Sequence, residues 1–161
     1  MNTRTASREN VAAGKGAVGP GYRFEEIEVG MRAETRNTVS DEHIRAFAAV
    51  SGDRNPVHLD EAFAETTFFG KRISQGMLTA SYISGVFGTQ LPGPGAIYVS
   101  QSLRFKQPVW IGDEIRTSVT VRETIPKKRR VLFSCECRNA RGEVVLEGEA
   151  ELMVPPRGAL S

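Results

Sequence analysis

The stretch from residue 76 to residue 90 constrains the fold most, because it has the pattern of a buried helix. Apolar residues recur there at helical spacing, and the remaining faces are also largely apolar. A helix that is apolar nearly all round is expected to lie inside the domain. One stripe of this predicted helix contains Met77, Ala80, Ser84, Phe87 and Leu91, and the other faces include Leu78, Tyr82, Ile83 and Val86.

Beyond this helix, apolar and polar residues alternate, which is the period of β-strands. Short turns between these strands predict an antiparallel meander, so the fold class is α+β, with the sheet curled round the buried helix. Such a sheet leaves a free edge and an exposed helix flank, which predicts a homodimer. Strands are predicted within 22–38 and at 97–106, 115–124, 131–137 and 144–154, and shorter helices at 41–50 and 60–67.

Length and charge bound the class of protein. The 161 residues suit one domain, predicted at 22–155, with a disordered tail at 1–21 and a short C-terminal tail at 156–161. The net charge of +2, without a basic face interleaved with aromatic residues, argues against nucleic acid as a partner. No apolar run is long enough for a membrane span or a signal peptide. A turn before the buried helix is expected to expose two cations, Lys71 and Arg72.

The two cysteines, Cys135 and Cys137, lie on one face of a predicted strand. Their spacing favours neither a disulfide nor, with only His43 and His58 available, a zinc site. Both thiols are therefore expected to be buried and reduced, which predicts a cytoplasmic protein without a bound metal.

A polar stretch between two predicted helices carries the candidate catalytic residues. Asp53, Asn55 and His58 lie within six positions, and Gly52 and Pro56 act against a helix that continues through them. The acid and the base are therefore expected on a loop, with the imidazole buried by apolar neighbours. Such a pair at the edge of an apolar space suits proton transfer. The residues alone also fit an ordinary turn followed by a core histidine.

Three blocks of the sequence, in register with one another, resemble the MaoC-like hydratases. The blocks are Asp-Arg-Asn-Pro-Val-His at 53–58, Ile-Ser-Gln-Gly-Met-Leu at 73–78 and Ser-Leu-Arg-Phe-Lys-Gln-Pro-Val at 102–109. Within that family the chain looks most similar to the (R)-specific enoyl-CoA hydratases, whose fold is the hot dog. The resemblance covers roughly 22–154.

The resemblance implies an enzyme that hydrates trans-2-enoyl-CoA to (R)-3-hydroxyacyl-CoA and catalyses the reverse dehydration, with no metal or redox cofactor. Asp53 and His58 match the catalytic pair of the family. Asn55 matches a polar residue that holds water or a partner, and Gly76 matches the position whose backbone N–H faces the thioester oxygen.

One position departs from the family pattern. Many relatives carry a histidine immediately before the glycine, where this chain has Gln75, whose amide donates hydrogen bonds but does not exchange protons. Only a supporting role is therefore expected for Gln75. Further along the helix, the spacing of Ser84 and Phe87 predicts a short acyl pocket with a floor.

Three other functions fit parts of the pattern. A hot-dog thioesterase usually carries a carboxylate on the central helix, and 77–91 has none. A MaoC-like dehydratase that acts on a branched or dicarboxylic acyl-CoA would show the same Asp–His pair. A non-catalytic partner subunit would be expected to lack the aspartate or the histidine, and this chain has both. The sequence leaves open the acyl chain, whether its carrier is CoA or an acyl carrier protein, and which residue protonates the α-carbon.

Overall fold

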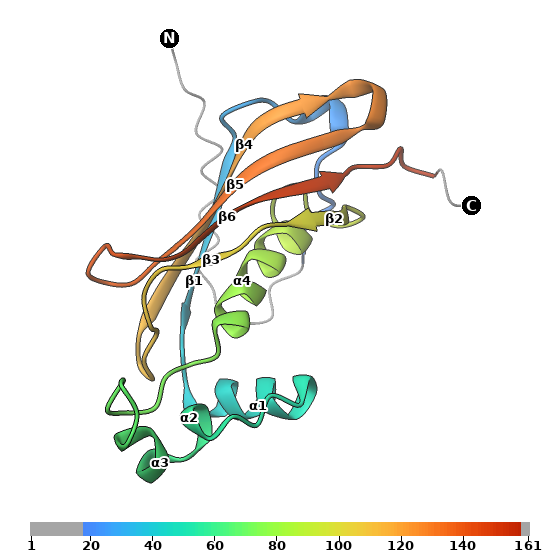
Figure 1. The fold of residues 1–161 in the computed structure, drawn as a ribbon. Helices are drawn as coiled ribbons and strands as arrows, with labels where there is room; N and C mark the ends of the chain where they lie inside the picture. Colours follow the sequence, from blue (N-terminus) through green and yellow to red (C-terminus); the bar gives the residue numbers. More distant parts are fainter. Residues whose placement is uncertain (1–17, 159–161) are drawn as a thin grey trace.

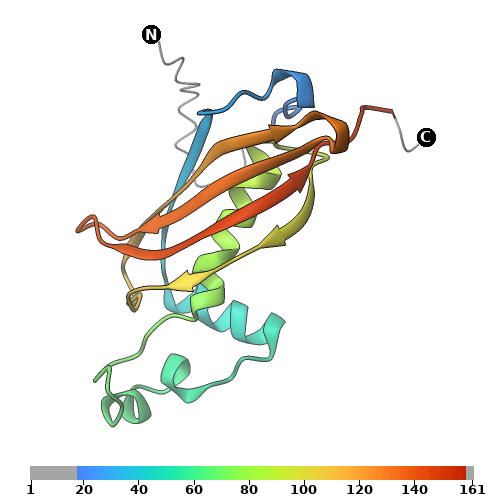
Figure 2. The same ribbon diagram turned by 45° about the horizontal axis from the view of Figure 1, so that its top comes forward.

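The computed structural model describes residues 18–158, in which an antiparallel sheet curls around helix α4 (Gly76–Thr89) (Figures 1 and 2). The sheet has the order β1-β4-β5-β6-β2, and β3 also pairs with β6. This arrangement confirms the α+β class. The strands are β1 (Arg32–Thr38), β2 (Ile97–Gln101), β3 (Arg104–Phe105), β4 (Glu114–Ile125), β5 (Arg130–Arg138) and β6 (Val144–Met153). The predicted tails at 1–21 and 156–161 lie mostly outside the described residues.

The predicted meander is correct only for β4, β5 and β6, which are consecutive neighbours. β1 returns beside β4, and β2 returns beside β6. The strand predicted at 97–106 is also split in two, and a glycine on the neighbouring strand explains why. The Ser102 backbone packs onto Gly148 so closely that a β-carbon at residue 148 would lie 1.8 Å from the Ser102 carbonyl oxygen. The chain bends where only glycine permits this approach.

Only one face of helix α4 packs against the concave side of the sheet. Its buried side chains join a core with β4, β5 and β6 that includes Val119, Phe133 and Cys135. The prediction of burial all round was wrong, because no described segment covers the opposite face. The buried face of α4 carries Leu78, Thr79, Ile83, Val86 and Phe87, and the exposed face carries Met77, Ser81, Ser84, Gly85 and Gly88.

Both cysteine thiols are free and buried in this core, as predicted. Burial raises the pKa of Cys135 to about 12 and that of Cys137 to about 11. Thiols with such pKa values stay protonated at neutral pH, so neither is an activated nucleophile.

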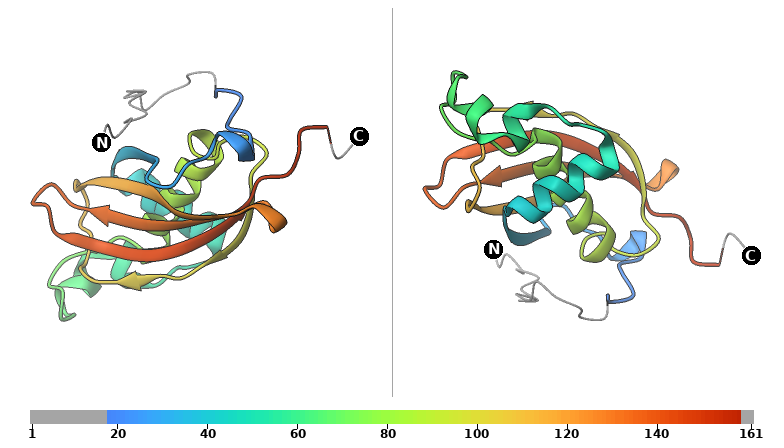
Figure 3. Two further views of the ribbon diagram at one scale, coloured as in Figure 1. Left: turned by 90° about the horizontal axis from the view of Figure 1, so that it is seen from above. Right: turned by 90° about the horizontal axis from the view of Figure 1, so that it is seen from below.

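Three short helices lie beyond the first turn of α4, at one end of the sheet (Figures 1 and 3). α1 (Asp41–Ser51) is capped by the Ser40 hydroxyl and ends at Gly52, whose φ of 78° is left-handed. α2 spans Pro56–Leu59 and α3 spans Glu61–Glu65. α2 and the loop that joins it to α1 carry the candidate catalytic residues to the first turn of α4.

Candidate active site

A cavity of about 450 Å³ opens where α2, the start of α4 and the segment after β3 meet. Four of the predicted site residues, Asp53, His58, Gln75 and Gly76, line it together. The remaining walls are mostly apolar. They are formed by Phe69, Ile73, Ser74, Met77, Thr79, Phe105, Lys106, Gln107, Pro108, Val109, Val145 and Leu146.

His58 lies on α2, where a loop was predicted. Proline disfavours a helix before it but suits the first helical position, and Pro56 occupies that position here. The Asn55 side chain caps the helix, since its Oδ1 accepts from the Val57 N–H at 3.1 Å. The local sequence therefore builds one helical turn that carries the imidazole to the cavity.

His58 is a buried residue, 8% exposed, and its ring nitrogen Nδ1 lies 2.8 Å from the Ile73 carbonyl oxygen. A carbonyl oxygen only accepts, so Nδ1 carries the proton and donates it. In the neutral ring, Nε2 is then an acceptor. This nitrogen lies 3.7 Å from Oδ2 of Asp53, which is beyond hydrogen-bonding distance.

Asp53 is held by the loop that joins α1 to α2. Its N–H donates to Oγ of Ser51 at 3.0 Å, and its Oδ1 accepts from the Asn55 N–H at 3.2 Å. These bonds leave Oδ2 turned toward the imidazole. Two hydrogen-bond acceptors, Oδ2 and Nε2, thus face each other across a gap in the cavity wall.

Gly76 is the first residue of α4, and the first N–H groups of a helix have no acceptor within it. The N-cap residue Gln75 makes no capping bond with its side chain. This helix end therefore offers unpaired N–H groups and the positive end of the helix dipole to an anion.

Gln75 is fully buried and links α4 to α1, because its Nε2 donates to the Ile44 carbonyl oxygen at 3.0 Å. Within the described residues, its Oε1 and the Oγ1 of Thr79 have no hydrogen-bond partner. Thr79 was not singled out from the sequence, although its position three residues after Gly76 places it on the same helix face.

Three predicted residues lie outside the cavity lining. Asn55 acts as the cap of α2, and its proposed contact with water stays a prediction. Ser84 is on the exposed face of α4. Phe87 is buried against Tyr98 and Phe133, with ring centroids 5.4 Å and 4.8 Å away. Their roles in substrate binding also stay predictions.

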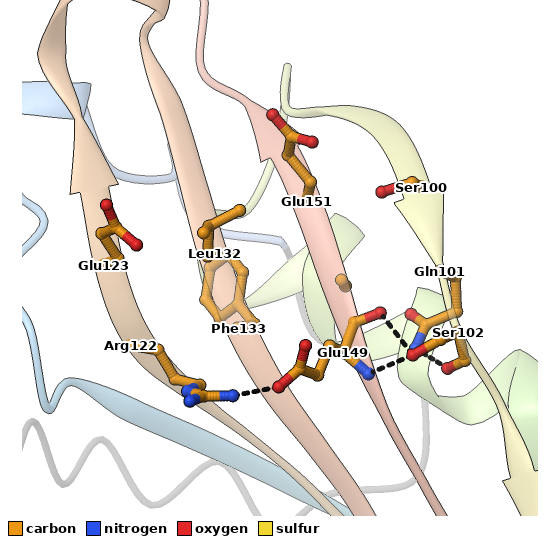
Figure 4. A pocket seen from close by; sticks show the side chains of 10 residues that line it. Ser100, Gln101, Ser102, Arg122, Glu123, Leu132, Phe133, Glu149 and Glu151 are labelled. Carbon is orange, nitrogen blue, oxygen red and sulfur yellow. Dashed lines mark hydrogen bonds and ion pairs between the residues drawn. The ribbon is translucent and has the colours of Figure 1, made fainter.

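A larger hollow of about 560 Å³ lies on the face of the sheet opposite α4 (Figure 4). Neither Asp53 nor His58 lines it. Two of its charged side chains, Arg122 and Glu149, form an ion pair with each other. The smaller cavity holds the acid, the base and the helix end, so it is the candidate active site.

Two absences hold for residues 18–158. No group of three or more His, Cys, Asp or Glu side chains is arranged to hold a metal ion. No helix in that part of the chain has the length and apolar content that would let it cross a membrane.

The fold and the cavity define a hot-dog protein with a carboxylate and an imidazole at the start of its central helix. The chain belongs to the MaoC-like family, because the family described as "MaoC like domain" matches residues 23–136. An (R)-specific enoyl-CoA hydratase of Rhodospirillum rubrum is 53% identical over 85% of this chain and 94% of its own. A 3-hydroxybutyryl-CoA dehydratase of Methylorubrum extorquens is 48% identical over 83% of this chain and 85% of its own.

Solved structures agree with this assignment. The unliganded R-hydratase PhaJ1 of Pseudomonas aeruginosa superposes with a TM-score of 0.81 and is 46% identical, over 85% of this chain and 88% of the other. The hot-dog fold implied by the sequence is thereby confirmed.

Proposed function

We propose that this protein hydrates trans-2-enoyl-CoA to (R)-3-hydroxyacyl-CoA and catalyses the reverse dehydration. The observation that carries the proposal is the 3.7 Å gap between His58 Nε2 and Asp53 Oδ2, beside the first turn of α4. The relatives support the substrate and the stereochemistry, since the Rhodospirillum rubrum protein matches nearly its whole length and is named for this activity.

One water molecule on the cavity side of the two acceptors would bridge them, since their 3.7 Å separation leaves no room for it directly between them. A water that donates one hydrogen to Nε2 and the other to Oδ2 would present its oxygen to C3 of the substrate. As the C3–O bond forms, one acceptor takes a proton, and the pair returns a proton to C2. The substrate thus gains the elements of water, and the pair ends in its starting protonation state.

The start of α4 would stabilise the charge that develops on the thioester oxygen. The Gly76 N–H would donate there, and the helix dipole favours the anion. One such donor typically contributes about 3 kcal/mol to transition-state stabilisation. The proposed reaction changes no oxidation state of the enzyme and calls for no metal or redox cofactor.

The acyl chain would extend from the thioester along the buried face of α4, toward Phe87 rather than toward Ser84 on the exposed face. Thr79 and Leu146 line the cavity on that side and would enclose a short chain. We therefore propose that crotonyl to hexenoyl thioesters are preferred and that Phe87 limits the space deeper in.

Absorbance at the enoyl-thioester band with crotonyl-CoA, followed by chiral analysis of the product, tests the proposal. The (R) product is expected, and Asp53→Ala and His58→Ala should each remove most activity while the protein stays folded. Release of free CoA thiol from a saturated acyl-CoA would instead favour the thioesterase. Wild-type kcat/KM in either variant would exclude the Asp53–His58 pair.

A homodimer is also proposed, formed at the β2 edge of the sheet. This edge strand exposes Ile97, Tyr98 and Val99, whereas the opposite edge, β1, carries charged side chains. Apolar edge strands favour pairing with a second copy. Free buried thiols support the expected cytoplasmic location.

Light scattering at micromolar concentration tests the dimer. The wild-type protein should have twice the chain mass, and Val99→Lys should shift it toward monomer because a charge on the edge opposes strand pairing. Thr38→Lys, on the β1 edge, is the control and should keep the dimer. A monomeric wild-type protein with full activity would refute the proposal.

A further inference from the structure

The sequence predicted that Arg72 would be an exposed cation. This prediction was wrong, because its side chain is only 11% exposed. Its Nε donates to the carbonyl oxygen of His58 at 2.7 Å, and its Nη2 donates to Oδ1 of Asp41 in a close ion pair. A buried guanidinium requires partners of this kind. One of them is the backbone of the candidate catalytic base.

The His58 carbonyl needs an outside donor because α2 is only four residues long. The last carbonyls of a helix lack intrahelical donors, and a single turn is not stable alone. Arg72 supplies the donor for His58. The next residue, Ile73, accepts from the imidazole, and its N–H donates to the Val57 carbonyl oxygen at 3.3 Å. Two consecutive residues thus hold His58 by its backbone and by its ring.

The contact with Asp41 extends this hold to α1. Asp41 is the first residue of α1, and the last residue of that helix, Ser51, bonds to the Asp53 N–H. Arg72 therefore joins the start of α1 to α2, and the loop that carries Asp53 lies between these helices. The 3.7 Å separation between Asp53 and His58 depends on how the two helices are placed.

We propose that Arg72 is a positioning residue, whose guanidinium fixes the His58 backbone against Asp41 and so places the imidazole relative to Asp53. Arg72 does not line the cavity and acts through His58. The catalytic meaning of this contact rests on the proposed function.

Arg45 provides a matched control. It is the other arginine that binds Asp41, with 2.9 Å between its Nε and Oδ2, but it lies on α1 one turn after Asp41 rather than beside His58. Arg72→Met removes every donor while keeping a long apolar stem. Arg45→Met makes the same chemical change at the Asp41 pair and leaves the His58 carbonyl with its donor.

Two readouts separate positioning from simple stabilisation. The first is kcat and KM with crotonyl-CoA. Arg72→Met should lower kcat about 10- to 100-fold with a smaller change in KM, because small displacements of a catalytic group have effects of that size. Arg45→Met should stay within about threefold of wild type, as expected for an exposed ion pair.

The second readout is the imidazole nitrogen spectrum by NMR, which needs no activity. The chain has two histidines, and the exposed His43 serves as an internal reference for His58. Arg72→Met should shift or broaden the His58 signals and leave those of His43 unchanged. Arg45→Met should leave both sets unchanged.

Wild-type kcat together with unshifted His58 signals in Arg72→Met would overturn the proposal. If that variant does not fold, Arg72→Lys decides, because an ammonium lacks the fork that reaches two partners at once. An intermediate loss of kcat with altered His58 signals supports positioning, and wild-type values in both overturn it. A wild-type protein without hydratase activity would refute the proposed function, while the His58 signals would still decide the role of Arg72.

Discussion

The Phe105 ring packs directly on the α-carbon of Gly76. A β-carbon built on Gly76 would lie 2.7 Å from Cε1 and 2.8 Å from Cδ1 of that ring, closer than packed atoms approach. Both residues line the cavity. The absence of a side chain at residue 76 therefore lets β3 come close to the start of α4 and gives the cavity wall its shape.

Gly76→Ala should consequently lower kcat/KM clearly, while the free energy of unfolding changes little. The Phe105 side chain is half exposed and can rotate away, so the free energy of unfolding should change by about 1 kcal/mol or less. The displaced ring would narrow the space where the thioester oxygen meets the helix N–H groups. Kinetics with crotonyl-CoA and denaturant melts measure the two effects. Gly76→Ala combined with Phe105→Leu should recover part of the lost activity, and no recovery would contradict this explanation.

Asp53 and His58 should act as one unit, because they share the same water position. Asp53→Asn and His58→Gln should each reduce kcat about 10²- to 10⁴-fold. The double variant should be no more than about tenfold slower than the worse single variant, since removing one member already disables the pair. Losses that multiply would show that the two residues act independently.

The fold was largely predictable from local patterns. The period of the apolar residues located α4 and the strands, and Gly52 marked the end of α1. The split between β2 and β3 was not predictable, because it depends on the contact between Ser102 and Gly148, which are far apart in the sequence.

Long-range pairs also explain what the sequence could not show about the site. Asp53 and His58 were found from their chemistry and spacing. The burial of Arg72 depends on Asp41, 31 positions earlier, and on a backbone carbonyl, neither of which has a local signature. The helical state of α2 could have been predicted, since Asn55 and Pro56 together form a helix start.

The Asp41–Arg72 pair predicts a change of stability with pH. Hydrogen bonds from Arg72, and secondarily from Arg45, hold the pKa of the Asp41 carboxyl below its ordinary value. The folded pKa is therefore below the unfolded value of about 3.9. The resulting stabilisation is present above that pH and is lost as the pH falls through the folded pKa.

Asp41→Asn should therefore be less stable than wild type at pH 7, and this difference should shrink as the pH approaches 2.5. Denaturant unfolding across this range measures it. Glu42→Gln is the control, since it removes a carboxylate from the same helical turn without touching Arg72. A difference between Asp41→Asn and wild type that stays constant down to pH 2.5 would contradict the linkage.

Phe87 determines the last prediction, which concerns acyl-chain length. It lies 11 residues after Gly76, about 16 Å along the helix at 1.5 Å per residue, and helix side chains lean back toward the N-terminus, into the space beyond a short chain. Phe87→Ala should shift kcat/KM toward octenoyl and longer thioesters, at about 1–3 kcal/mol for each methylene newly accommodated.

The Phe87 ring is 2% exposed, so Phe87→Ala should also lower the free energy of unfolding by about 3–5 kcal/mol. Phe133→Ala is the control. It removes the β5 ring that packs on Phe87 and should leave the chain-length profile unchanged. A folded Phe87→Ala protein with the wild-type profile would remove Phe87 from the pocket.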